Sequence, residues 1–251
     1  MRARPRGILF DLDDTLISAY SNQRAAWDAV VREMAAALHP LPPHDVVDAL
    51  IAFATHFWSD ADRHRHWRQH LIAARRAVVA GALSALRAAG HATPPPEVGD
   101  RLADRFSAYR EEQMHLFAHA HDVLDAVRGA GIALALITNG ASIDQRPKIT
   151  RFDLARRFDH IQIEGEHGFG KPEERAYRHA VQSLGLAPHE CWMVGDNLEW
   201  EVVAPQRLGI FSVWYDGTAA GVPVSASARP DLVVTSLRGV LAALGLESAA
   251  A

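Results

Sequence analysis

The sequence predicts an α/β protein whose parallel sheet is interrupted, directly after its first strand, by a helical segment. Short apolar runs alternate with helical patterns over the second half of the chain. A long stretch before them has helical spacing only, and one further apolar run, residues 7–10, stands alone near the amino terminus. Strands that alternate with helices are typical of a parallel sheet covered by helices on both faces.

The composition is that of an ordinary globular chain. Its 251 residues are 49% hydrophobic and 22% charged, which suits one large domain or a core with an insert. The formal charge of -4 argues against a nucleic acid polymer as partner. The apolar stretches are too short for a membrane span, and no signal-peptide core is visible. The single cysteine, Cys191, has apolar neighbours, so we expect a buried, inert thiol and a cytoplasmic protein.

The predicted sheet is assembled from short apolar runs bounded by turn signals. Strands are expected at residues 7–10, 132–137, 160–163, 192–194, 210–214 and 232–234. A helix is expected over 122–128, another around Ile149 to Phe158, and a third from Pro172, which suits a first helical turn, to about Leu184. The segment 221–230 is expected to be a loop, and residues 248–251 are expected to fray.

The interrupting segment shows apolar residues at intervals of three and four, the spacing of amphipathic helices. Helical patterns cover 26–38, 46–57, 71–86 and 102–114, with Ser21 as N-cap of the first and the prolines at 40–43 ending it. The sequence therefore predicts an α/β core of residues 1–17 plus 119–251 and an all-helical insert of residues 18–118. Linkers near Ser18 and Phe117 are expected to hinge the two parts.

An acidic stretch, Asp11-Leu12-Asp13-Asp14-Thr15, follows the first predicted strand. Residues i and i+2 of an extended chain point the same way, so Asp11 and Asp13 are expected to project from one face. They stand at the carboxyl end of a strand, where open α/β sheets place their ligand sites. Two close carboxylates repel each other and favour a cation or a shared proton. A plain acidic turn is the alternative.

Further polar groups follow other predicted strands or lie in loops beside them. Thr138 and Asn139 come directly after the second strand, Lys171 precedes a helix, and Asp196 and Asn197 follow the strand at 192–194. Taken singly, these residues also fit a plain turn, a surface lysine and a helix cap. Their order, each beside a buried strand, favours a shared site.

The residue types suit phosphoryl transfer. Asp11 is a candidate nucleophile, because carboxylates form covalent phosphoaspartate intermediates. Asp11 and Asp196 can hold Mg²⁺, which prefers oxygen ligands. Thr138 and Lys171 can bind the remaining phosphate oxygens, since this catalysis is mostly positioning and charge stabilisation. Asp13 can protonate the leaving oxygen and then activate water.

Four motifs occur in a fixed order along the chain: Asp11-Leu12-Asp13-Asp14-Thr15, Thr138, Lys171-Pro172 and Gly195-Asp196-Asn197. They resemble the motifs of the haloacid dehalogenase (HAD) superfamily, and the helical insert resembles its C1 cap. The resemblance spans nearly the whole chain. It implies a Rossmann-like core and a Mg²⁺-dependent phosphatase, a phosphoric monoester hydrolase with an aspartyl-phosphate intermediate on Asp11.

The same resemblance implies metal ligation by Asp11, Asp196 and the backbone carbonyl of Asp13. It also places Thr138, Asn139 and Lys171 at the substrate phosphate. Dehalogenase members lack the second aspartate of the first motif, so Asp13 favours a phosphatase.

One position departs from the family pattern. The fourth motif usually carries a second acid, commonly Asp, five residues after its first, and here that residue is Glu201. The charge is kept, and the reach is one methylene longer. We expect Glu201 and Asn197 to surround the metal's own ligands, with Glu201 bonding a water or a neighbour. A solvent-facing helix residue beside Trp200 is the alternative for Glu201.

The helical insert carries the basic stretch His64-Arg65-His66-Trp67-Arg68-Gln69-His70. His66 and His70, at i and i+4, are expected to share a helix face with the spacing of half a metal site, but no glutamate adjoins them as in the zinc-protease motif. These residues either form a solvated basic face or contact an anionic substrate.

Other functions stay open beside a phosphatase for a small phosphorylated metabolite. A phosphomutase or a dehalogenase can use the same fold, and a catalytically silent relative can bind a ligand or partner. The intact set of motif residues argues against a silent relative. Substrate identity and oligomeric state do not follow from the sequence.

Overall fold

The computed structural model describes residues 4–20, 22–223 and 229–246, and the chain divides into two compact units. The first contains Met1–Ser18 and His115–Ala251, and the second contains Ala19–Met114. The sequence placed these boundaries at 17/18 and 118/119. The difference arises because two short strands, β2 (Ile17–Ser18) and β3 (His115–Leu116), pair antiparallel within the first unit.

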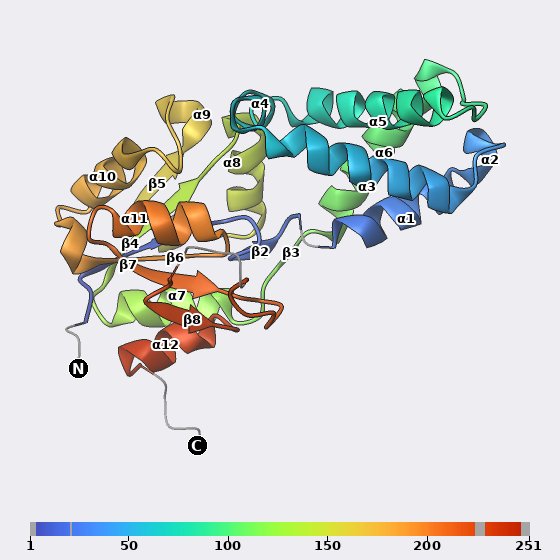
Figure 1. The fold of residues 1–251 in the computed structure, drawn as a ribbon. Coiled ribbons are helices and arrows are strands. Elements are labelled where there is room, and N and C mark those ends of the chain that lie inside the picture. The colour runs from blue at the N-terminus through green and yellow to red at the C-terminus, as the bar shows by residue number, and fades with distance from the viewer. Residues whose placement is uncertain (1–3, 21, 224–228, 247–251) are drawn as a thin grey trace. The chain divides into compact units, whose positions relative to one another are not determined.

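The first unit is built on a six-stranded sheet with the order β5-β4-β1-β6-β7-β8 (Figure 1). The strands are β1 (Gly7–Phe10), β4 (Ala133–Thr138), β5 (His160–Ile163), β6 (Cys191–Gly195), β7 (Phe211–Tyr215) and β8 (Leu232–Val234). Each neighbouring pair is parallel. The predicted α/β class, with a parallel Rossmann-like sheet, is confirmed.

Helices cover both faces of this sheet (Figure 1). On one face lie α10 (Glu174–Ser183) and α11 (Ala204–Gln206), and on the other α7 (Ala120–Gly129) and α12 (Arg238–Leu244). Tyr177 and Val181 of α10 pack with Leu9 and Met193 of the central strands in one apolar core. The remaining helical elements are α8 (Ser142–Arg151), η1 (Ala155–Arg157), α9 (Glu164–His167), η2 (Pro188–Glu190) and η3 (Leu198–Val203).

The central strands are apolar along their whole length because helices lie above and below them. All four residues of β1 are buried, as are all five of β6. This is the burial pattern of parallel strands that face a core on both sides. Cys191 begins β6, and burial raises the pKa of its thiol to about 12. The expectation of a buried thiol is thus confirmed, and the raised pKa is consistent with low reactivity.

The second unit consists of helices α1 (Gln23–Glu33), α2 (Ala35–Leu38), α3 (Pro43–Ser59), α4 (Ala61–Trp67), α5 (Leu71–Ala88) and α6 (Pro96–Gln113). The apolar faces of the four longest, α1, α3, α5 and α6, share one core. At its centre the rings of Trp27 and Phe106 stack with centroids 3.5 Å apart. In either unit, no described helix is both long and apolar enough to cross a bilayer.

Some sequence predictions fall on residues that the structure does not describe. Ser21, the predicted N-cap, lies outside the described residues, and α1 begins at Gln23 after Asn22. Part of the predicted loop at 221–230 and all of the predicted fraying end also lie outside them.

The prediction that His66 and His70 share one helix is wrong. The side chain of Asp60 accepts a hydrogen bond from Arg63 N and starts the short helix α4, which ends at Trp67. His70 is the residue before α5, and its N–H donates to Trp67 O at 2.9 Å. The turn between the helices still leaves the two imidazole rings 5.2 Å apart. The two rings are therefore neighbours across a turn rather than on a helix face.

Candidate active site

The motif residues of the first unit stand at the carboxyl ends of three adjacent strands. Asp11 follows β1, and its N–H donates to Val194 O at 2.9 Å, which extends the pairing with β6. Asp196 follows β6, and Thr138 is the buried last residue of β4. Because β1 lies between β4 and β6, this edge of the sheet brings the three residues together, as expected for an open α/β sheet.

Lys171 lies at the centre of the site, with its side chain 1% exposed. Its Nζ is 2.5 Å from Asp11 Oδ1 and 2.7 Å from Glu201 Oε1. Burial lowers the pKa of Lys171, but the charges of Asp11 and Glu201 raise it more, so that the net pKa lies above its ordinary value. The side chain is therefore a permanent ammonium, shared between two carboxylates.

Asn139 holds the loop that carries Lys171. Its Oδ1 accepts from Lys171 N at 2.8 Å, and its Nδ2 donates to Lys171 O at 2.7 Å. Gly170 is required beside this clamp, because a Cβ at that position would overlap Asn139 Oδ1. The side chain that the sequence assigned to the substrate phosphate thus already binds the loop backbone, and we assign it to positioning Lys171.

Glu201 is buried, which rules out the solvent-facing alternative for this residue. Besides its ion pair with Lys171, its Oε2 accepts from Asn197 N at 2.7 Å. The side chain crosses directly over Gly195, where a Cβ would overlap Glu201 Cγ. The longer reach of glutamate is therefore used to contact the ammonium of Lys171.

The backbone around Asp196 is fixed on both sides. Asn197 Oδ1 accepts from Glu199 N at 3.0 Å and from Trp200 N at 3.1 Å, which is the bonding pattern of an N-cap. Trp214 Nε1 donates to Asp196 O at 2.6 Å. The side chain of Asn197 thus caps η3, the alternative that the sequence left open for it.

Two residues of α8 complete the site, and the sequence analysis missed both. Lys148 Nζ lies 2.8 Å from Asp13 Oδ1, and Gln145 Nε2 donates to Asp13 Oδ2 at 2.9 Å. Gln145 also donates to Asn139 O at 2.6 Å. Residues at i and i+3 share a helix face. Two polar residues with this spacing, in the helix directly after Thr138, were the available signal.

The charges around Asp11 fit a divalent cation. Asp11, Asp196 and Glu201 bring three negative charges against the one positive charge of Lys171, a formal balance of −2. Asp11 Oδ2 is buried and lacks a hydrogen-bond partner among the described residues. Burial, then the charges of Asp11 and Glu201, raise the pKa of Asp196 to about 9. A cation with oxygen ligands would relieve this repulsion, and Mg²⁺ suits such a donor set.

Comparison with known proteins agrees with this geometry. Residues 5–209 match the family of haloacid dehalogenase-like hydrolases. The phosphoserine phosphatase of Thermus thermophilus is 34% identical over 253 aligned residues, which cover 95% of this chain and 99% of that protein. The glyceraldehyde 3-phosphate phosphatase of Pyrococcus furiosus is 26% identical, over 98% of this chain and 95% of its own length.

Solved structures show the same fold. A HAD hydrolase from Bacillus subtilis, bound to magnesium, superposes with a TM-score of 0.68 at 21% identity and covers 96% of this chain and 99% of its own. A HAD family hydrolase from Deinococcus radiodurans, with bound phosphate and sodium, gives 0.67 at 24% identity over 99% and 100%. Since the family match spans most of the sequence, this chain belongs to the haloacid dehalogenase-like hydrolases.

Proposed function

We propose that the chain is a Mg²⁺-dependent phosphatase that hydrolyses a small phosphate monoester through an aspartyl-phosphate on Asp11. The observation that carries this proposal is the buried pair of Asp11 and Lys171, 2.5 Å apart at the end of the central strand. In such a pair, Asp11 would be the carboxylate nucleophile, and the adjacent positive charge of Lys171 could bind phosphate oxygens. The curated relatives named above are phosphatases, which supports the same reaction.

In the first step, a carboxylate oxygen of Asp11 attacks phosphorus, and the bond between phosphorus and the ester oxygen breaks. Asp13 donates its proton to the leaving oxygen. Lys171 and the hydroxyl of Thr138 bind phosphate oxygens that do not react. Gln145 and Lys148 position the carboxyl group of Asp13 for this transfer.

In the second step, water attacks the aspartyl-phosphate and gives its proton to Asp13. The bond between phosphorus and Asp11 breaks, which releases inorganic phosphate and restores the carboxylate. Asp11, Asp196 and the backbone carbonyl of Asp13 would hold Mg²⁺, whose charge would stabilise the phosphate oxygens. Asp196 needs no proton-transfer role in this scheme.

The test is phosphate release from a panel of monoesters, with phosphoserine, glyceraldehyde 3-phosphate and nucleoside monophosphates among them, with and without Mg²⁺. We expect EDTA to abolish turnover, Mg²⁺ to restore it, and Ca²⁺ to substitute poorly because its looser coordination does not hold the geometry. Asp11→Asn should fold and be inactive, and Asp13→Asn should lose about 10²–10⁴-fold in rate.

Asp122→Asn is the matched control, because it makes the same change at an exposed acid of α7. Wild-type turnover by Asp11→Asn would refute the covalent mechanism, and full activity of metal-free protein would refute the Mg²⁺ requirement. Halide release from a 2-haloacid, without phosphate release from any ester, would assign the dehalogenase reaction instead.

A further inference from the structure

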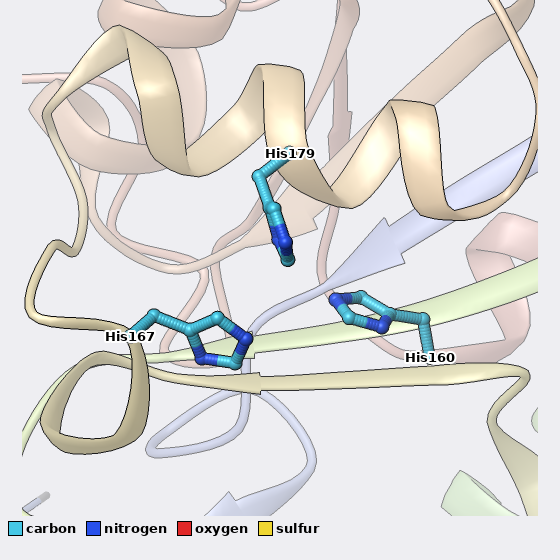
Figure 2. Close-up of side chains that lie close together, drawn as sticks. All are labelled: His160, His167 and His179. Carbon is cyan, nitrogen blue, oxygen red and sulfur yellow. The ribbon is translucent and has the colours of Figure 1, made fainter.

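Three histidines converge at the edge of the sheet (Figure 2). His160 begins the outer strand β5, His167 ends α9, and His179 lies on α10. One nitrogen from each ring lies within 4.8 Å of the other two. In Figure 2 the rings point toward one shared space. The proposed phosphatase mechanism uses none of them.

Hydrogen bonds fix the tautomers of two of these rings. His167 Nδ1 lies 3.1 Å from Ile163 O, and a carbonyl oxygen can only accept, so this nitrogen carries the proton. Its Nε2 therefore keeps a lone pair. Metal-binding histidines typically donate their second ring N–H in this way to a carbonyl or carboxylate.

The side chain of Gln162 fixes the tautomer of His179. Its Nε2 donates to Ala176 O at 3.0 Å, which orients the amide so that Oε1 lies 2.7 Å from His179 Nδ1. His179 Nδ1 is thus the donor, and Nε2 again keeps the lone pair. Gln162 is itself buried, so this orientation is held firmly.

The third ring supplies an unsatisfied atom. His160 Nε2 is buried and has no hydrogen-bond partner among the described residues. Burial lowers the pKa of His160 and His179, and the neighbouring imidazoles lower both pKa values further. Both shifts favour the neutral imidazole of His160 and His179, which is the form that binds metals.

We propose that His160, His167 and His179 bind one divalent transition-metal ion through their Nε2 atoms, with Zn²⁺ as the best match. Neutral imidazole is a preferred ligand of Zn²⁺, and three histidines leave a fourth position for water. Zn–N bonds of about 2.0–2.1 Å place tetrahedral ligand nitrogens about 3.3 Å apart. The three ligand nitrogens lie within 4.8 Å of one another, so binding would draw them together by at most about 1.5 Å.

The three-histidine site differs in its ligand atoms and in its expected effect from the candidate Mg²⁺ site around Asp11 and Asp196. Mg²⁺ prefers oxygen ligands and competes poorly for imidazole. A metal here would join β5, α9 and α10, and the chain runs from His167 over three residues to Lys171. The expected effect of the ion is therefore to stabilise the folded protein and the segment that leads to Lys171.

The test uses the full chain without an affinity tag, first dialysed against a chelator and then titrated with Zn²⁺ in excess Mg²⁺. We expect one tightly bound Zn²⁺ per chain and a rise in melting temperature. His167→Gln and His179→Gln should each abolish tight binding and that rise. Gln162→Met keeps all three histidines but removes the hydrogen-bond partner of His179 Nδ1, and should weaken binding by about 10–100-fold.

His189→Gln is the matched control, since His189 is an exposed histidine of the same unit. The double variant His66→Ala, His70→Ala removes the other close pair of rings and should keep the tight site. Metal-free variants are compared with metal-free wild type by circular dichroism. If His179→Gln fails to fold, the His167→Gln variant, at a partly exposed position, is compared with wild type instead.

Zinc binding by wild type no tighter than by His167→Gln would overturn the proposal, as would loss of the tight site in the double variant. Asp11→Asn separates this proposal from the proposed function. It should be inactive as a phosphatase and should bind Zn²⁺ as wild type does.

Discussion

At the scale of single residues, Glu201 shows what one methylene changes. Its carboxylate spans Gly195 and reaches both Lys171 Nζ and Asn197 N. Lys171 is a buried charge that also forms an ion pair with Asp11. Removing one partner of a buried ion pair leaves a charge that is only partly compensated, which makes Glu201 a determinant of stability as well as of geometry.

We predict that Glu201→Ala lowers the free energy of unfolding by about 3–5 kcal/mol, because the buried ammonium of Lys171 then loses one of its carboxylate partners. Glu201→Gln should be milder, since it still accepts the N–H of Asn197. Urea unfolding measures both. Glu199→Ala is the control, as Glu199 is an exposed acid of the same helix.

The same variants test whether Glu201 also serves the metal. Loss of a residue that orients metal ligands typically costs about 10–100-fold in affinity, so the Mg²⁺ concentration for half-maximal rate should rise by that order. If the Glu201→Ala protein were destabilised but its Mg²⁺ requirement unchanged, Glu201 would stabilise Lys171 without contributing to metal binding. Wild-type stability in that variant would contradict the ion-pair argument itself.

At the scale of elements, the start of η3 is set by its cap. The side chain of Asn197 satisfies two backbone N–H groups, and Glu201 satisfies the N–H of Asn197 itself. Helix starts need such partners, because their first N–H groups have none within the helix. The loop that carries Asp196 is thus anchored by the first turn of the helix after it.

We predict that Asn197→Ala lowers the free energy of unfolding by about 1 kcal/mol, and that Asn197→Asp, which preserves a cap, restores most of it. Thermal unfolding measures the stability, and a Mg²⁺ titration of activity measures the metal site. If Asn197→Ala raised the Mg²⁺ requirement without any change in stability, Asn197 would act on the metal rather than as a cap.

At the scale of the whole molecule, the chain consists of two compact units. The α/β unit contains every residue of the proposed reaction, and the helical unit has a core of its own. The histidines of the helical unit contribute little to that core, since His66 and His70 are exposed and His64 rests its ring on Trp58. Replacing them should therefore leave that core in place.

We predict that the triple variant His64→Ala, His66→Ala, His70→Ala changes relative kcat/KM across the monoester panel more than it changes the melting temperature. The expected reason is loss of positive or hydrogen-bonding groups for an anionic substrate. His91→Ala, another exposed histidine of this unit, is the control. Identical kinetics for the triple variant and wild type would indicate that these histidines form a solvated surface and do not contact the substrate.

Where the strands and the charged strand ends lie could be predicted from the sequence. The apolar runs at 7–10, 160–163 and 232–234 match β1, β5 and β8, and the other three strands of the large sheet differ by one residue at each end. The two-residue strands β2 and β3 were not predicted. The helical insert was also visible, apart from the break between α4 and α5. These features are local, because burial on both faces or on one face imposes a periodicity that a short window of sequence displays.

Partners far apart in the chain were decided only by the tertiary structure. Lys171 and Asp11 are 160 residues apart, and Lys148 and Asp13 are 135 apart. The histidines of the proposed zinc site come from three different elements. Sequence by itself determined which polar groups stand at strand ends and in the loops beside them. Which of them touch depends on how helices pack on the sheet, and that packing follows from side-chain shapes that no local periodicity contains.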